Sequence, residues 1–214
     1  MKNLSWLEYE GQTTAELMAC KNTHRIDSLL CAFEWGIQAK AGPDGADTLS
    51  NEERLVLGVM ALTREVNNGG YHQFFLNSSH RFAPIIVDSL RRIGCLTCAD
   101  ITARAIRAAK FDAAFPESIL EEDHARDEVL DACDQEFYQL SDIEDKLFAF
   151  VEANQSRIQL NKRLPVPGAA SQGKAVESDK TFRAPNCLQA EDYKSGGSAP
   201  VGVRCGEGKR DRAH

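Results

Sequence analysis

Two adjacent glycines interrupt the most apolar helical pattern in this chain. Apolar residues recur at helical spacing between about residues 51 and 67, and an aromatic segment follows over about residues 71–76. Between the two lies Asn-Asn-Gly-Gly. Asn and Gly can adopt the left-handed conformation that ends a helix, and glycines let two backbones approach closely. The sequence therefore predicts a long helix that stops at residues 67–70 and a short aromatic helix that starts just after them.

Helical spacing of apolar residues continues through most of the first 158 residues. It predicts further helices over about 13–40, 98–111, 119–140 and 142–158, and one that carries Pro84 in its first turn and ends at Gly94. Capping boxes mark four helix starts, with a weaker one at Thr97 and Asp100. The four are Thr13/Glu16, Ser50/Glu53, Ser118/Glu121 and Ser141/Glu144. Since no alternating strand pattern appears, we expect an all-α fold, a compact multi-helix domain with short antiparallel connections.

The composition divides the chain into three regions. Residues 1–47 form an N-terminal helical region, and residues 48–158 form the main helical domain. Residues 159–214 hold 7 of the 15 glycines and 4 of the 7 prolines, with a charge of +4 from 10 Lys and Arg against 6 Asp and Glu. Such a composition cannot bury a core, so we expect this tail to be disordered.

The overall charge and the apolar runs exclude several classes of protein. A net charge of −7 argues against direct binding of nucleic acid. The chain has no run of 18 apolar residues and no apolar secretion signal at its start, so we expect no membrane span and a cytoplasmic location. Seven cysteines without a secretory address fit reduced thiols. Cys95 and Cys98 stand alone as a CxxC pair, and two small apolar residues are a better interpretation than a redox pair or half a zinc site.

Acidic residues are concentrated in one stretch. Residues 117–145 contain 12 Asp and Glu and a single cation, Arg126, so their charge is −11, whereas the rest of residues 1–158 balances at 14 against 14. The eight carboxylates between 121 and 136 amount to roughly one charge per 3 Å of helix axis, against one per about 3.4 Å on a single DNA strand. This stretch is either an ordinary solvated helix face or a surface that competes for a phosphate-binding site. Four of these carboxylates share one stripe: Asp123, Asp127, Asp131 and Asp134.

Three stretches resemble a known family. They are EVNNGGYHQFFLNSS, RFAPIIVDSLRRIGC and LDACDQEFYQLSDIEDKLFAFVEAN, and together they are similar to the DNA-mimic protein family over about residues 48–158. The resemblance implies an all-helical, acidic and often dimeric protein. It also implies that a described branch copies the charge pattern of DNA and binds a DNA-binding transcriptional regulator. The motif that carries the resemblance consists of Asn67, Asn68, Gly69, Gly70, Tyr71, Gln73, Phe74 and Phe75, and we assign it a structural role. The basic tail lies outside the family pattern.

The leading hypothesis is a DNA-mimicking interaction protein without enzymatic activity, cofactor or metal. It would bind a DNA-binding protein, in particular a helix-turn-helix regulator, and block its DNA site. By position, the family's acidic surface corresponds to the acidic stretch here, with Glu52 and Glu53 as an extension. The expected partner-binding residues are Glu121, Glu122, Asp123, Asp127, Glu128, Asp131 and Asp134.

Three alternatives remain open. The same acidic surface would also suit an immunity or inhibitor protein against a toxin that acts on nucleic acid. A second alternative is a small-molecule-binding or enzymatic domain at the Asn-Gly-Gly junction, built from Asn67, Asn68, His72 and Gln73. It predicts an open pocket there, whereas a structural motif predicts a filled junction. The third is a helical scaffold without a specific ligand.

Overall fold

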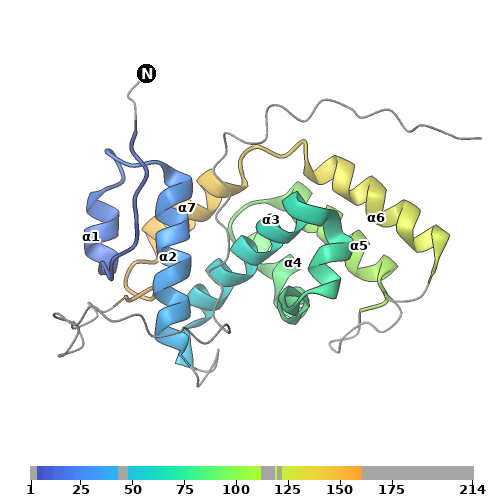
Figure 1. Ribbon diagram of the computed structural model, residues 1–214, viewed down its shortest axis with the longest axis horizontal. Coiled ribbons are helices and arrows are strands. Elements are labelled where there is room, and N and C mark those ends of the chain that lie inside the picture. Colours follow the sequence, from blue (N-terminus) through green and yellow to red (C-terminus); the bar gives the residue numbers. More distant parts are fainter. Residues whose placement is uncertain (1–3, 43–47, 112–118, 120–121, 161–214) are drawn as a thin grey trace, which may run out of the picture. The chain divides into compact units, whose positions relative to one another are not determined.

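The computed structural model describes residues 4–42, 48–111, 119 and 122–160, all of which lie within one compact unit, residues 1–171 (Figure 1). Among these residues the chain forms helices and no β-strand, which confirms the all-α fold. The tail expected to be disordered lies outside the described residues, apart from Gln159 and Leu160. The elements are α1 Thr14–Ala19, α2 Ile26–Ala41, α3 Asn51–Leu76, the 3-10 helix η2 Ser78–Phe82, α4 Ala83–Arg92, α5 Leu96–Ala108, α6 His124–Phe137 and α7 Ile143–Ala153.

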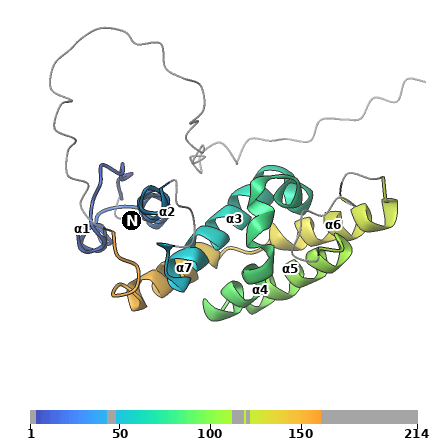
Figure 2. The same cartoon turned by 90° about the horizontal axis from the view of Figure 1, so that it is seen from below.

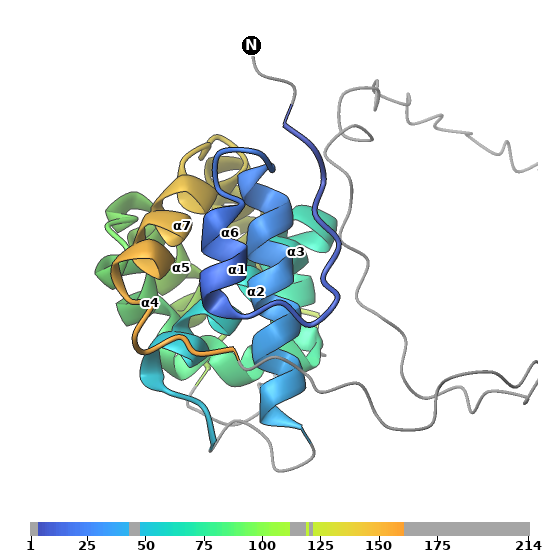
Figure 3. The same ribbon diagram turned by 90° about the vertical axis from the view of Figure 1, so that its left-hand side faces the viewer.

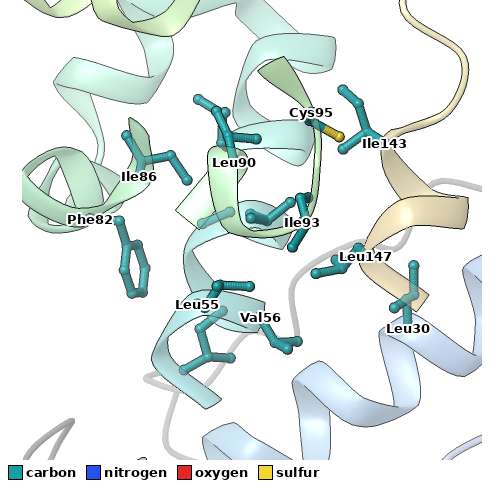
Figure 4. Close-up of a cluster of buried hydrophobic side chains, with 14 of the residues drawn as sticks. Leu30, Leu55, Val56, Phe82, Ile86, Leu90, Ile93, Cys95, Ile143 and Leu147 are labelled. Carbon is teal, nitrogen blue, oxygen red and sulfur yellow. The ribbon is translucent and has the colours of Figure 1, made fainter. Parts of the chain in front are cut away.

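The long helix α3 organises the others. Its first half packs against α2, α4 and α7, and its second half lies beside η2 and α6, while α5 packs between α4 and α6 (Figure 2). One apolar cluster joins several of these elements: Leu30 comes from α2, Leu55 and Val56 from α3, and Leu147 from α7 (Figure 4). The aromatic residues of the second half of α3 are fully buried, so they belong to the core. No helix among the described residues is long and apolar enough to cross a membrane.

The helix expected over 13–40 is wrong as a single element, because the chain forms two helices there. After α1 the backbone turns and pairs with the N-terminal segment instead of continuing the helical ladder. The Ser5 N–H donates to the Thr23 carbonyl at 3.2 Å, and the Arg25 N–H donates to the Ser5 carbonyl at 3.0 Å. These bonds use the groups that a continuous helix would need for its own i→i−4 pattern. Helix α2 therefore starts only at Ile26.

Two of the expected capping boxes are confirmed, and the starts of three helices differ from expectation. At α1 and α3 the Ser or Thr hydroxyl and the Glu carboxylate each accept the other's backbone N–H. Helices α5 and α7 begin at Leu96 and Ile143 without a side-chain cap, so the boxes expected from Thr97 and Ser141 are wrong. Ser118 lies outside the described residues. Helix α6 starts at His124 and not near 119, because the Asp123 carboxylate caps it by accepting the Arg126 N–H at 3.1 Å.

The segment after α7 closes the N-terminal region onto α3. The Thr14 hydroxyl donates to the Ile158 carbonyl at 2.6 Å and accepts the Leu160 N–H at 3.0 Å. The Ser50 hydroxyl donates to the Arg157 carbonyl at 2.8 Å. Figure 3 shows this segment running past α1 and α2, and the Ile158 and Leu160 side chains are buried there.

Candidate protein-interaction surface

Helix α6 carries most of the predicted acidic surface and has two distinct faces. Its inner face is buried against α3 and α5. The side chains on that face are Arg126, Leu130, Cys133 and Phe137. On the opposite side, Glu128 and Asp131 are exposed, and Glu122 is exposed just before the helix. Among the described residues these three carboxylates have no cation partner, and we call them the outward carboxylates.

Three of the other predicted carboxylates, Asp123, Asp127 and Asp134, have partners inside the chain. Asp123 caps α6 and lies 3.8 Å from the Lys110 ammonium. The hydrogen bond from the Arg126 N–H, with help from Lys110, lowers the pKa of Asp123. Asp127 pairs with the buried Arg126 guanidinium at 2.7 Å and keeps 44% of its side chain exposed. Glu121 lies outside the described residues.

Cations from α5 also reduce the charge of this region. Arg104 pairs with Glu136 at 2.5 Å. Lys110, which follows α5, reaches Asp123. The sequence estimate of −11 with Arg126 as the only counter-charge misses Arg104 and Lys110, because α5 and the residues just after it lie outside the acidic stretch in sequence but next to it in space. The charge density of the free carboxylates is therefore lower than the count along the sequence predicts.

The proposed extension to Glu52 and Glu53 is wrong. Both side chains are buried at the start of α3. Glu52 pairs with Arg92 at 3.0 Å, and Glu53 pairs with Lys40 at 2.7 Å. These carboxylates stabilise the N-terminus of α3 and its neighbours, and they are not available to a partner.

The break at the Asn-Gly-Gly junction is confirmed. Helical geometry is lost at Gly69, with φ −166° and ψ 26°, and at Gly70, with φ 73° and ψ −175°, and it resumes at Tyr71. The two halves meet at a kink, so α3 runs as one interrupted element from Asn51 to Leu76. Only glycine adopts the backbone geometry of Gly70 at low cost.

Helix α6 and its C-cap satisfy backbone groups on both sides of the break. The Tyr71 N–H, the first after the break, donates to the Asp134 carboxylate at 2.8 Å. The Tyr138 hydroxyl donates to the Val66 carbonyl, just before the break, at 3.0 Å. Burial raises the pKa of the half-buried Asp134 carboxyl, and the bond from the Tyr71 N–H partly offsets that rise. The structure thus joins the two sequence features that seemed separate, the acidic helix and the glycine motif.

The interior of the junction is filled by the chain's own side chains. The buried Glu65 carboxylate accepts from Gln73 at 2.8 Å, from Asn77 at 2.7 Å and from Ser79 at 2.8 Å. Among the described residues, no buried side-chain nitrogen or oxygen lacks a hydrogen-bond partner. This arrangement favours the structural interpretation of the motif over a small-molecule pocket. Sequence reasoning missed Glu65 as the centre of the network, although a charged residue beside the apolar stripe of α3 was a signal for it.

The aromatic part of the motif anchors the same junction. Tyr71 is fully buried, its hydroxyl lies 2.7 Å from the Thr102 hydroxyl of α5, and its ring meets Phe137 of α6 edge-on at 6.0 Å. Phe74 and Phe75 are also fully buried, and their rings lie 5.4 Å apart. Asn67 is half-buried, and Asn68 and Gly69 are exposed.

The cysteine pair at the start of α5 is buried, as expected for small core residues. Burial raises the pKa of the Cys98 thiol to about 12, and this effect outweighs the lowering by the hydrogen bond with Thr102 and by Lys146. Among the described residues, no group of three or more His, Cys, Asp or Glu is placed to hold a metal ion.

Comparison with known proteins identifies the family. No curated protein and no solved structure matches the sequence. A family model described as DMP19-like protein matches residues 47–154, slightly more than half of the 214 residues. The match begins just before α3 and ends just after α7, so it contains both the Asn-Gly-Gly junction and the acidic helix, and it agrees with the stretch over which the resemblance was seen. The chain therefore belongs to the DMP19-like protein family.

Proposed function

We propose that this protein is a non-enzymatic DNA mimic that binds a DNA-binding protein through α6 and blocks its DNA site. Membership of the DMP19-like family supports the proposal, and the outward carboxylates of α6 are the observation that carries it. The partner would be a helix-turn-helix regulator, whose basic surface is built to hold phosphates. A homodimer is part of the same proposal, and light scattering of the purified chain measures it.

The mean spacing of the accessible carboxylates along the axis of α6 is close to that of phosphates along the axis of DNA. Asp127 precedes Asp131 by four residues, so Asp127, Glu128 and Asp131 span about 6 Å of helix axis at about 1.5 Å per residue. The intervals are uneven, at about 1.5 Å and about 4.5 Å along the axis. Their mean of about 3 Å compares with one phosphate per about 3.4 Å of axis on one strand of DNA. Glu122 adds a further carboxylate before the helix. A basic groove that binds a short run of phosphates would therefore meet a similar run of charges.

The rigid attachment of α6 supports the same role. Its inner face is buried, Asp123 caps its start, and Asp134 and Tyr138 hold its C-terminal end at the break in α3. A charged surface that is already ordered loses little conformational entropy when it binds. Electrostatic complementarity of this kind accelerates association and makes binding sensitive to salt.

Affinity capture from native lysate with the full chain as bait tests the proposal. The variant Glu122→Gln, Glu128→Gln, Asp131→Asn removes the outward carboxylates. A matched control, Glu8→Gln, Glu10→Gln, Asp88→Asn, removes three exposed carboxylates elsewhere that also have no cation partner among the described residues.

We expect the wild-type chain and the control to retain a DNA-binding protein that duplex DNA displaces, and the variant to lose it. Retention by the variant as strong as by the control would contradict the proposal. So would a complex that is insensitive to salt up to about 0.5 M, because surface charges are strongly screened there. Capture of a nuclease whose activity is inhibited would instead support the immunity-protein alternative, which uses the same surface.

A further inference from the structure

We infer that contacts with the Asn-Gly-Gly junction position α6. Asp134 acts there as a hydrogen-bond acceptor and not as one of the charges presented to a partner. The consequence for partner binding rests on the proposed function. The positioning itself does not, since it concerns only contacts within the chain.

The contacts of Asp134 give the first reason. Its carboxylate accepts the Tyr71 N–H at 2.8 Å, and the residue is half-buried, whereas Asp131 one turn earlier is exposed. The Tyr71 N–H opens the second half of α3, where the preceding carbonyls cannot serve it because the glycines break the ladder. Asp134 thus supplies from α6 the cap that a residue before Tyr71 would otherwise provide.

Gly70 gives the second reason. A Cβ atom added to Gly70 would lie 2.0 Å from one Asp134 carboxylate oxygen, and its three nearest atoms would all belong to Asp134. The missing side chain therefore makes the space that the Asp134 carboxylate occupies. The glycine serves the contact with α6 as well as the turn.

Tyr138 gives the third reason. It follows Asp134 by four residues, so both lie on the same side of α6. Its hydroxyl holds the Val66 carbonyl on the other side of the break at 3.0 Å. One face of α6 and its C-cap thus contacts the backbone both before and after the glycines.

The contacts of Asp134 and Tyr138 with the junction fix the rotation of α6 about its own axis. Residues on an α-helix are separated by about 100°, so Asp131 lies about 60° and Glu128 about 120° around the helix from Asp134. With Asp134 held against α3, these two carboxylates face outward. A partner would therefore contact a row whose direction is set by the junction.

Two substitutions at one position separate charge from position. Asp134→Asn removes the charge and keeps an acceptor oxygen of the same reach. Asp134→Glu keeps the charge and adds a methylene group in the space beside Gly70. Asp131→Asn, on the outward face, is the matched control for loss of one charge.

The first readout is amide hydrogen exchange at Tyr71 in the full chain. We expect Asp134→Glu to accelerate it about tenfold, Asp134→Asn to change it by less than about threefold, and Asp131→Asn to leave it unchanged, because a buried N–H depends on an acceptor in the right place. Exchange that is unaffected in Asp134→Glu, or equally fast in both Asp134 variants, would overturn the inference.

The second readout is capture of the DNA-displaceable protein from native lysate. We expect Asp134→Asn to retain it like wild type, whereas Asp134→Glu and Asp131→Asn retain several-fold less. The reverse order for the two Asp134 variants would show that Asp134 acts as a charge. If the wild-type chain captures no DNA-binding protein, the proposed function fails, and the exchange at Tyr71 still decides the positioning.

Discussion

Replacing Gly70 with Ala should destabilise the protein through two separable effects. The residue has φ 73° and ψ −175°, a region that residues with a side chain rarely occupy. The new methyl group would also lie 2.0 Å from an Asp134 carboxylate oxygen, so either α6 or the backbone of the junction must move. Such a movement removes the acceptor of the Tyr71 N–H.

The size of the two effects follows from the structure. The backbone geometry costs about 1–3 kcal/mol for a residue other than glycine. A buried N–H that loses its acceptor costs a further ~1–3 kcal/mol. The expected loss in free energy of unfolding is therefore about 2–6 kcal/mol, a large part of the stability of an ordinary domain.

Gly42→Ala is the matched control. Gly42 has φ 54° and ψ −155°, close to the geometry of Gly70, and a Cβ added there meets nothing within 4 Å. Its substitution should cost only the backbone part, about 1–3 kcal/mol. Any effect of alanine on the unfolded chain is common to both variants and cancels in the comparison.

Urea unfolding of the full chain at pH 7, followed by far-UV circular dichroism, measures these differences. A double-mutant cycle with Asp134→Ala isolates the contact, because the methyl group no longer meets a carboxylate in that background. We expect a coupling free energy of about 1–3 kcal/mol. Additive effects of Gly70→Ala and Asp134→Ala, or a cost for Gly70→Ala no larger than for Gly42→Ala, would refute the view that Gly70 makes room for Asp134.

Three further measurements test the interior. Glu65→Gln replaces one acceptor oxygen of a carboxylate that receives three hydrogen bonds by an amide donor, so urea unfolding should show a loss of about 2–4 kcal/mol, and a loss below about 0.5 kcal/mol would contradict the network. Ile158→Ala should cost about 2–5 kcal/mol because Ile158 is fully buried, whereas Leu96→Ala, at a side chain that is 62% exposed, should stay within about 0.5 kcal/mol. Burial raises the pKa of Cys98 from 9.0 to about 12, so the folded chain keeps a proton that the unfolded chain releases, and stability should fall as pH rises between these values. The loss from pH 8 to pH 10 in wild type should exceed that in Cys98→Ala by about 1.4 kcal/mol, and equal losses would contradict a buried thiol.

Local patterns in the sequence predicted the elements whose causes are local. Apolar spacing and a capping box identified the start of α3, and the two glycines identified its break, because each feature acts within a few residues. Pro84 and Gly94 likewise marked the start and the end of α4. The division between α1 and α2 was missed because its cause is the pairing with Ser5, about 20 residues away.

The acidic surface was likewise predictable where its causes are local and not where they depend on distant residues. The sequence correctly predicted that Asp127, Glu128, Asp131 and Asp134 lie on one helix, but it also placed Glu122 and Asp123 there, and both precede α6. It could not show that Arg104 and Lys110 reach Glu136 and Asp123, since these pairs join segments that are 32 and 13 residues apart. The sequence also could not show that Asp134 faces α3 while the outward carboxylates are exposed, because that difference depends on the rotation of α6 against α3.

The residues outside the family match complete the same core. Without α2, buried side chains such as Leu30 and Phe33 would be absent and the first half of α3 would expose its apolar face. The segment that holds Ile158 and Leu160 lies beyond residue 154, where the match ends, and it bonds to Thr14 at the start of α1. The matched region and its flanking segments are therefore one structural unit, and a bait or variant is best tested in the full chain.

The three sides of α6 have different roles, and these roles limit which acidic residues can be substituted. The inner side fixes the helix to the core and is apolar apart from Arg126, which pairs with Asp127, so an unpaired charge placed there would destabilise the fold. At position 134 the side chain must have the length of Asp, because it accepts the Tyr71 N–H in the space beside Gly70. A longer acidic side chain does not fit there. Within the part of the chain that the structure describes, only the side with Glu128 and Asp131 is free of such contacts. If the proposed function holds, substitutions there should alter partner binding with little effect on stability. The free energy of unfolding and the affinity for a partner should therefore respond to different residues of the same helix.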